Sequence, residues 1–159
     1  MNIYLICVGK IKEKYLKEAI NEYSKRLSRY CRLHIIEVQD EKIPENASQK
    51  EEIMIKEKEG EALLKNLKDN MYAIALDLKG IMLSSEELSD HIKCCGINGN
   101  SNIAFIIGGS LGLSDSVLKR VDFRLCFSKM TFPHQLMRVI LLEQIYRSFK
   151  IINGETYHK

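Results

Sequence analysis

Residues 103–112 read IAFIIGGSLG and carry the clearest signal for the architecture of this chain. The first five residues are apolar without a break, a pattern typical of a short strand buried on both faces of a parallel sheet. Gly108, Gly109 and Gly112 then form a glycine-rich turn at the carboxyl end of that strand. Because parallel strands need crossover connections, strands and helices should alternate on either side of this segment.

The rest of the chain shows that alternation. Apolar runs predict further strands at residues 2–8, 33–38, 72–77 and 123–127. Helical spacing and capping signals predict helices at residues 11–30, 47–68, 84–95 and 114–120, and from Pro133 to about Phe149. Lys79-Gly80 is expected to turn the chain, and Gly60 to weaken the second helix. We therefore expect one α/β domain over residues 1–159, with a mainly parallel sheet flanked by helices.

Composition restricts the class of protein further. The 159 residues are 45% hydrophobic and 28% charged, which excludes a disordered chain. No apolar run approaches the roughly 20 residues that span a bilayer, and residues 2–8 are typical of a strand rather than a signal peptide. A cytoplasmic protein with no membrane partner is expected. The five cysteines lack disulfide or zinc spacing and the four histidines are scattered, so we expect structural thiols and no metal.

The net charge of +3 is too small to indicate a nucleic-acid binder by itself, but its distribution is uneven. Residues 10–32 carry a local charge of +5 and residues 124–159 one of +4, while residues 40–61 carry −4. A polyanion could be bound on such local patches. The alternative is that these charged segments are simply the solvent-exposed faces of helices and bind nothing.

Three features could carry chemistry. The glycine turn at residues 108–112 lies where ligands bind in parallel α/β domains, although it matches neither a dinucleotide fingerprint nor a Walker A loop. The last helix is apolar around most of its circumference, which favours a homodimer interface. Within it, Arg138 and Arg147 either extend to solvent, pair with Glu143, or point at an anion or a base. The tail at residues 157–159 is either an inert terminus or an arm that orders on a substrate.

Several blocks occur together in a recognisable order: ALDLKG at residues 75–80, IIGGSLGLS at 106–114, MTFPHQLMRV at 130–139, EQIYR at 143–147 and the closing Tyr157-His158-Lys159. Together they make the chain resemble the ribosomal RNA large subunit methyltransferase H family, small members of the SPOUT (α/β-knot) methyltransferases. The resemblance spans residues 1–159. It implies a minimal SPOUT domain with a C-terminal trefoil knot, and a homodimer with its active site built across the interface.

The activity that the resemblance implies is methyl transfer from S-adenosylmethionine to N3 of pseudouridine 1915 of 23S rRNA on the assembled ribosome. By the same analogy the methyl donor is bound by Leu76, Gly108, Phe127, Ser128, Lys129, Met130, Thr131 and Phe132. The residues expected to act on the base are His158 as proton acceptor, Tyr157, and Arg138 as anion or base binder. No metal is expected, because a sulfonium is already a reactive methyl donor.

Other functions remain open at this point. A SPOUT methyltransferase acting on tRNA is one, although the chain has no additional RNA-binding domain. A ribosome-associated RNA-binding protein without catalysis is another, and a flavodoxin-like nucleotide binder is a third. Ser110 stands where some family members have proline after the paired glycines, but every glycine of the turn is kept.

Overall fold

The computed structural model describes residues 1–157, which form five strands and five helices in alternation. In chain order these are β1 (Asn2–Val8), α1 (Lys14–Leu27), β2 (Arg32–Val38), α2 (Gln49–Leu64), β3 (Tyr72–Met82), α3 (Ser85–Ile97), β4 (Asn102–Ile107), α4 (Asp115–Arg120), β5 (Phe123–Cys126) and α5 (His134–Ile152). Every strand pairing is parallel and the strand order is β2-β1-β4-β3-β5. The predicted parallel α/β architecture is confirmed.

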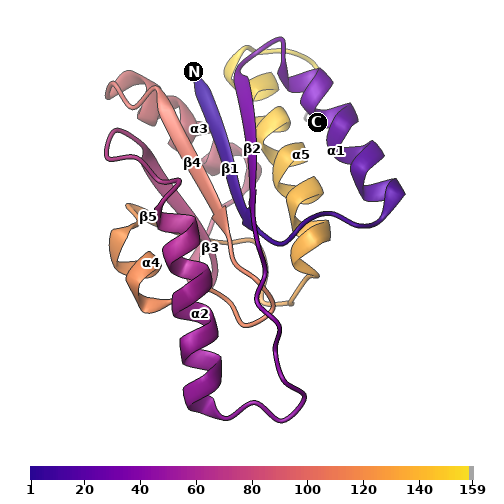
Figure 1. The fold of residues 1–159 in the computed structure, drawn as a ribbon. Coiled ribbons are helices and arrows are strands. Elements are labelled where there is room, and N and C mark those ends of the chain that lie inside the picture. Colours follow the sequence, from indigo (N-terminus) through magenta and orange to yellow (C-terminus); the bar gives the residue numbers. More distant parts are fainter. Residues whose placement is uncertain (158–159) are drawn as a thin grey trace.

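Helices cover both faces of the sheet (Figure 1). Helices α1, α3 and α5 pack on one face, where Leu16, Ile92 and Leu141 belong to one apolar cluster with inward-facing strand residues. Helices α2 and α4 cover the other face through a second cluster that includes Leu63 and Val117. Strand β4 lies between β1 and β3, and this buried position explains its unbroken apolar sequence.

The helices begin where capping residues allow. Ser84 caps α3, its hydroxyl accepting from Glu87 N–H while the Glu87 carboxylate accepts from Ser84 N–H, so the predicted capping box is confirmed. Helix α2 is shorter than predicted and begins with a similar box at Ser48. Gly60 does not interrupt it. A Cβ at Gly60 would lie 2.2 Å from Ser114 Oγ, so this glycine lets α2 pack closely against the start of α4.

The turn predicted at Lys79-Gly80 is wrong. Strand β3 continues to Met82, and both Leu76 and Ile81 pair with Leu125 of β5, so the residues between them form a bulge. A Cβ at Gly80 would lie 2.6 Å from the Arg124 carbonyl oxygen, which explains why glycine stands there. Beyond the bulge β3 pairs with β5 again, where Met82 lies opposite Cys126.

Helix α5 packs between α1 and α3 on the sheet, so most of its apolar residues are covered within one protomer. An outward strip remains, with Leu136 exposed and Val139 and Ile140 partly exposed. No helix in the described part of the chain is long and apolar enough to cross a membrane.

Candidate functional site

A pocket of about 1070 Å³ opens at the carboxyl ends of β3, β4 and β5. Its walls come from the bulge of β3, the glycine turn after β4, the loop after β5 and the first turn of α5, with Lys56 of α2 at its edge. This is the end of a parallel sheet at which ligands bind in α/β proteins. A cavity therefore lies at the glycine turn, where the sequence predicts a ligand site.

Seven of the eight residues predicted to bind the methyl donor line this one pocket: Leu76, Gly108, Phe127, Ser128, Met130, Thr131 and Phe132. Lys129 belongs to the same loop but is not among the lining residues. The loop is held by the hydrogen bond from Met130 N–H to Ser128 Oγ, at 2.9 Å. Residues far apart in the sequence thus surround one space.

The glycine turn has its shape because its residues lack side chains. Gly112 has a φ of +84°, which L side chains rarely adopt. A Cβ at Gly108 would lie 2.8 Å from the Gly112 carbonyl oxygen, and Gly112 N–H donates to Gly109 O at 3.0 Å. The turn therefore folds back on itself and exposes backbone groups to the pocket.

Charged side chains that the sequence reasoning did not single out also line the pocket. The basic ones are Lys56, Lys79, Lys119 and Arg124, and the acidic ones are Asp77 and Asp115. Arg124 Nε donates to Asp77 Oδ2 at 2.6 Å, and this ion pair joins β5 to the bulge of β3. The ALDLKG block contained Asp77 and Lys79, but nothing local indicated which side chains would face the pocket.

His134 is a second residue not selected from the sequence. It is the first residue of α5 and lines the pocket beside Pro133. Burial lowers the pKa of its imidazole from the ordinary value of 6.5, and the Arg138 charge one turn along α5 lowers that pKa further. His134 therefore presents a neutral imidazole to the pocket at neutral pH.

Arg138 does not line the pocket and has no exposed surface. It donates from Nη1 to Glu37 Oε1 at 2.8 Å, and from Nη2 to the carbonyl oxygens of Val8 at 2.7 Å and Gly9 at 2.8 Å. Arg138 therefore neither extends to solvent nor pairs with Glu143, two of the alternatives left open by the sequence. The anion that Arg138 meets is the Glu37 carboxylate, and its buried guanidinium faces the interior of the protomer. Binding of an RNA base by Arg138 stays a prediction.

Tyr157 lies against the outer side of α5, far from the pocket. Its hydroxyl donates to Glu143 Oε1 at 3.2 Å, its ring packs edge-on against Tyr146, and the Arg147 guanidinium lies 4.8 Å from its ring centroid. Arg147 also binds Glu143, as one of the open alternatives had it. Tyr157 is not among the residues that line the pocket. One protomer thus does not bring Tyr157 to the pocket.

Burial and the neighbouring Glu143 carboxylate raise the pKa of Tyr157 to about 12. Its hydroxyl is therefore protonated at neutral pH and is suited to donate a hydrogen bond rather than to accept a proton. His158, the residue predicted to accept the proton, lies outside the described residues.

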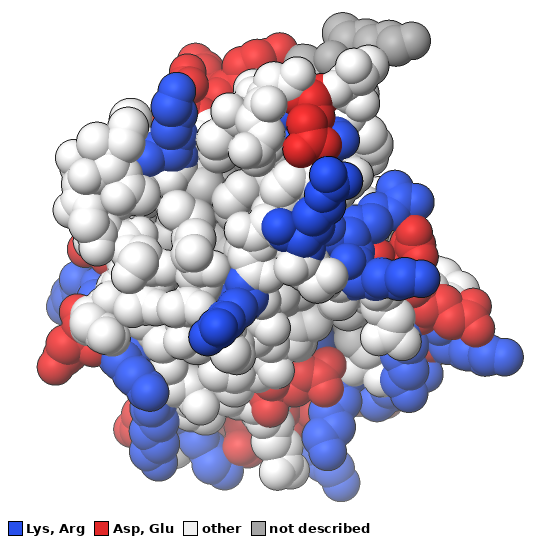
Figure 2. Space-filling view, turned by 90° about the horizontal axis from the view of Figure 1, so that it is seen from above, with Lys and Arg blue, Asp and Glu red and all other residues white. Residues whose placement is uncertain are grey.

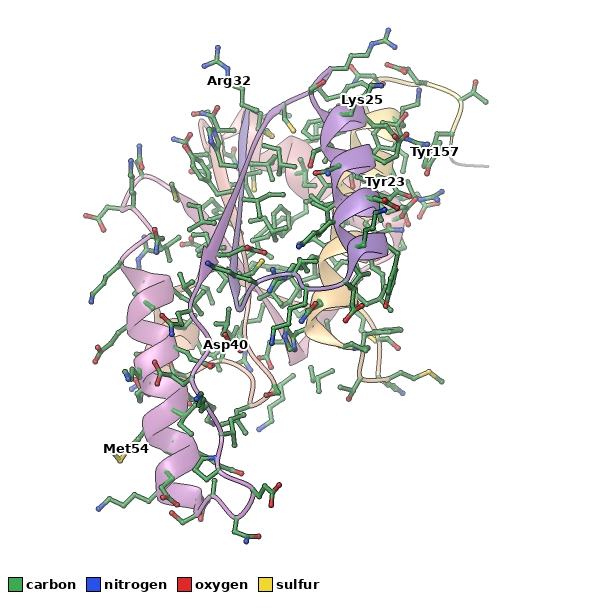
Figure 3. All side chains as sticks on the ribbon, turned by 45° about the vertical axis from the view of Figure 1, so that its right-hand side comes forward. Tyr23, Lys25, Arg32, Asp40, Met54 and Tyr157 are labelled. Carbon is green, nitrogen blue, oxygen red and sulfur yellow. The ribbon has the colours of Figure 1, made fainter. Side chains whose placement is uncertain are left out.

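The basic residues at the end of α1 and at the start of β2 lie at the other end of the molecule. Figure 3 shows Lys25 and Arg32 where the strands begin, with Asp40 toward the opposite end. Figure 2 looks onto the end of the molecule where the strands begin. It shows Lys and Arg side chains in separate groups, interspersed with Asp and Glu and with uncharged surface. Arg26 is bound to Glu22 at 2.8 Å and lies over the ring of Tyr23. The positive charge is local rather than one continuous patch.

Four of the five thiols are buried, and burial raises the pKa of Cys7 to about 12. A thiol with that pKa is a structural group rather than a nucleophile. Within residues 1–157, no three His, Cys, Asp or Glu side chains are grouped so that they could hold a metal ion.

Comparison with known proteins agrees with this geometry. A family model described as "Predicted SPOUT methyltransferase" matches residues 1–158. The chain is 70% identical over 159 residues to the ribosomal RNA large subunit methyltransferase H of Clostridium botulinum (strain Alaska E43 / Type E3), with full coverage of both chains. It is 69% identical, also over 159 residues and with full coverage of both, to the protein of that name from Alkaliphilus oremlandii (strain OhILAs).

A solved structure from Bordetella pertussis Tohama I, described as a probable methyltransferase, has a TM-score of 0.58 to this chain at 11% identity. It covers 92% of this chain and 95% of its own, and at that identity the likeness concerns the fold alone. The family match, by contrast, rests on nearly the whole sequence. Together with the full-length relatives, it shows that the chain belongs to the SPOUT methyltransferase family.

Proposed function

We propose that this protein transfers a methyl group from S-adenosylmethionine to N3 of pseudouridine 1915 in 23S rRNA on the assembled ribosome. The observation that carries the proposal is the pocket at the carboxyl ends of β3, β4 and β5, lined by seven of the eight residues expected to hold the donor. The full-length relatives are named ribosomal RNA large subunit methyltransferase H, and these names support rRNA as the substrate class.

The pocket suits a nucleoside-containing donor. Gly112 has open space where a Cβ would stand, and backbone groups at strand ends can bind an adenine edge. Leu76, Met130 and Phe132 supply apolar surface, while Asp77 offers a carboxylate at the rim. When bound, S-adenosylmethionine supplies a methyl group on a positively charged sulfur, which needs no metal to react.

Methylation of the imide N3 requires removal of its proton. Of the three residues expected to act there, Tyr157 is suited to hold the base or its oxygen as a hydrogen-bond donor, because its hydroxyl stays protonated. We assign the proton-accepting role to His158 Nδ1 or Nε2. Arg138 holds the protein framework behind the pocket, and its binding of the base stays a prediction.

A homodimer would bring the tail of one protomer to the pocket of the other. This arrangement is supported by the absence of Tyr157 from the lining of its own protomer's pocket, and by the outward strip at Leu136, Val139 and Ile140. The single SPOUT domain over residues 1–159 and its C-terminal trefoil knot belong to the same proposal. They are supported by the return of α5 from the β5 edge to its place between α1 and α3.

The RNA would be bound by basic side chains in two places. Lys56, Lys79 and Lys119 edge the pocket, and the basic end of α1 lies on the side of the tail. A ribosomal substrate makes the cytoplasm the expected compartment. A small enzyme with only these local positive patches is suited to a substrate that an assembled particle presents in one geometry.

The test is methyl transfer from labelled S-adenosylmethionine to ribosomes that lack the modification, compared with free large subunits and bulk tRNA. Label in 23S rRNA, strongest with whole ribosomes, is expected. Label in tRNA alone would leave the donor site intact and overturn the substrate. No transfer to any RNA by a protein that binds the donor would contradict the enzymatic function.

A further inference from the structure

Only two charged side chains in the described part of the chain are buried, and both hold the same short segment. Arg138 of α5 has no exposed surface, and Glu59 of α2 is 5% exposed. They approach from opposite faces of the sheet, since α5 and α2 belong to different helix layers. The segment between them is residues 37–41, which leaves the end of β2; we refer to it as the β2 exit segment.

On the α5 side, Arg138 Nη1 donates to Glu37 Oε1 at 2.8 Å. The same guanidinium donates to the carbonyl oxygens of Val8 and Gly9, where β1 ends. Gly9 has a φ of +82°, and its N–H donates to Val38 O at 2.7 Å. The ends of β1 and β2 are thus fastened to the first turns of α5, the part of that helix which lines the pocket.

On the α2 side, Glu59 Oε1 accepts from Glu41 N–H at 3.0 Å. The Glu59 carboxylate also lies directly beside the glycine turn, because a Cβ at Gly109 would be 2.9 Å from Glu59 Oε2. Burial raises the pKa of Glu59, with the neighbouring Asp40 and Glu41 adding to that shift. Burying a carboxylate costs free energy unless it is hydrogen-bonded, and the Glu41 N–H supplies one such bond.

We propose that Arg138 and Glu59 are positioning residues that, through the β2 exit segment, hold two walls of the pocket at a fixed separation. One wall is the start of α5 with His134 and Met137, and the other is the glycine turn. Neither side chain needs to touch a ligand. The inference rests on the proposed function in taking the pocket as the donor site.

The test uses paired variants of the full-length protein. Glu59→Met keeps the volume but removes the acceptor for Glu41 N–H, whereas Glu59→Gln keeps an acceptor oxygen. Arg138→Met and Arg138→Lys form the second pair. Ser89→Ala is the control, because Ser89 is also buried and hydrogen-bonded, to Ser148 O at 3.2 Å, but lies between α3 and α5 away from the pocket.

Two readouts are taken: the Kd of S-adenosylhomocysteine by calorimetry, and the hydrogen-exchange rates of the backbone amides at residues 108–113. Both methionine variants should weaken binding about tenfold and speed exchange in the turn, because each removes a buried hydrogen bond. Glu59→Gln should stay close to wild type, Arg138→Lys should recover part of the loss, and Ser89→Ala should change neither readout. The double methionine variant should lose less than the product of the two single losses.

Wild-type affinity and unchanged exchange in both methionine variants would overturn the inference, as would equal losses in Glu59→Gln and Glu59→Met. If Arg138→Met does not fold, the Glu59 pair decides the question alone. Failure of the wild-type protein to bind S-adenosylhomocysteine would instead refute the donor site. The exchange rates would still test the positioning role in that case.

Discussion

The Arg138 guanidinium and the Glu37 carboxylate, 101 positions apart in the sequence, form an ion pair at 2.8 Å at the point where β1 and β2 end. The arginine is fully buried and its Nε has no hydrogen-bond partner among residues 1–157, while the Glu37 side chain keeps 31% of its surface exposed. Glu37 Oε1 also accepts from Ile11 N–H at 3.1 Å, so the same carboxylate holds the loop between β1 and α1. This pair therefore joins three segments behind the pocket.

Breaking the pair from one side should destabilise the protein strongly. We expect Arg138→Met to lower the free energy of unfolding by about 3–5 kcal/mol, because Glu37 and two carbonyl oxygens lose their partner. Urea unfolding measures this loss. The double variant Arg138→Met/Glu37→Leu should recover part of it, and Ser89→Ala should lose only about 1 kcal/mol. A loss in Arg138→Met no larger than that of Ser89→Ala would contradict this account of the pair.

Two glycines with the same backbone conformation offer a matched test of the pocket. Gly112 in the turn and Gly99 in a distant loop both have a φ of +84°, and neither has an atom within 4 Å of an added Cβ. Alanine should cost each about 1–2 kcal/mol of stability through backbone strain alone. We expect Gly112→Ala to weaken binding of S-adenosylmethionine and Gly99→Ala to leave the Kd unchanged. Equal effects on the Kd would mean that the turn has no part in the site.

The lowered pKa of His134 predicts a loss of stability in acid. The folded state disfavours protonation, so between the folded pKa and the ordinary value of 6.5 the unfolded chain binds more protons. Stability is thus fully present above pH 6.5 and falls as pH drops through the folded pKa. Melting temperatures measured from about pH 8 to about pH 5 should show this decline, and His134→Gln should make it shallower.

His91, packed between Tyr72 and Phe123, is the control for that experiment because burial lowers its pKa as well. His91→Gln should also flatten the stability profile. Only His134→Gln should alter how the affinity for the cationic donor depends on pH, since only His134 lines the pocket. A pH dependence of donor affinity that survives in His134→Gln would rule out this role for the imidazole.

The hydroxyl of Tyr157 is predicted to act as a hydrogen-bond donor. Tyr157→Phe keeps the ring contacts with Tyr146 and Arg147 but removes the bond to Glu143. We expect kcat/KM for methyl transfer to ribosomes to fall by about tenfold, with the donor Kd unchanged. The pH–rate profile should keep its shape, because a pKa of about 12 lies above the working range. A basic limb that Tyr157→Phe abolishes would show instead that the phenol titrates during the reaction.

Charge reversal on α1 tests the RNA surface. Changing Lys25, Arg26 and Arg29 to glutamate should weaken ribosome binding and reduce its dependence on salt concentration, because phosphate contacts are lost. The control reverses three exposed lysines in and after α2, Lys50, Lys65 and Lys68, and so makes the same change in net charge. Binding measured by sedimentation should fall only for the α1 variant. An equal loss in both would indicate net charge rather than a defined surface.

Much of this fold could be predicted because its signals are local. The apolar run of β4, the capping box at Ser84 and the glycine turn each indicate their own conformation within a few residues. The bulge in β3 could not be predicted, because it depends on the approach of Gly80 to the backbone of β5. The packing role of Gly60 could not be predicted for the same reason, since it depends on the approach of Ser114 at the start of α4.

The site shows a similar division. The proposed donor pocket is built from segments that sequence blocks mark clearly, whereas the contacts of Arg138 depend on Glu37, which lies in a different part of the chain. His134 lies within the segment MTFPHQLMRV, but that this residue lines the pocket follows only from the course of the chain into α5. Tyr157 stays a predicted catalytic residue, and only the structure shows that it does not line the pocket of its own protomer.

The most direct test of the whole account is a crystal structure of the protein with S-adenosylhomocysteine. We predict that the ligand lies in the pocket at the ends of β3, β4 and β5, against Leu76, Gly108 and Phe132. The tail of a second protomer should lie at the mouth of that pocket. Ligand density elsewhere, such as the smaller groove between α3 and α5 beside Leu88 and Ile140, with an empty pocket at the strand ends, would contradict it.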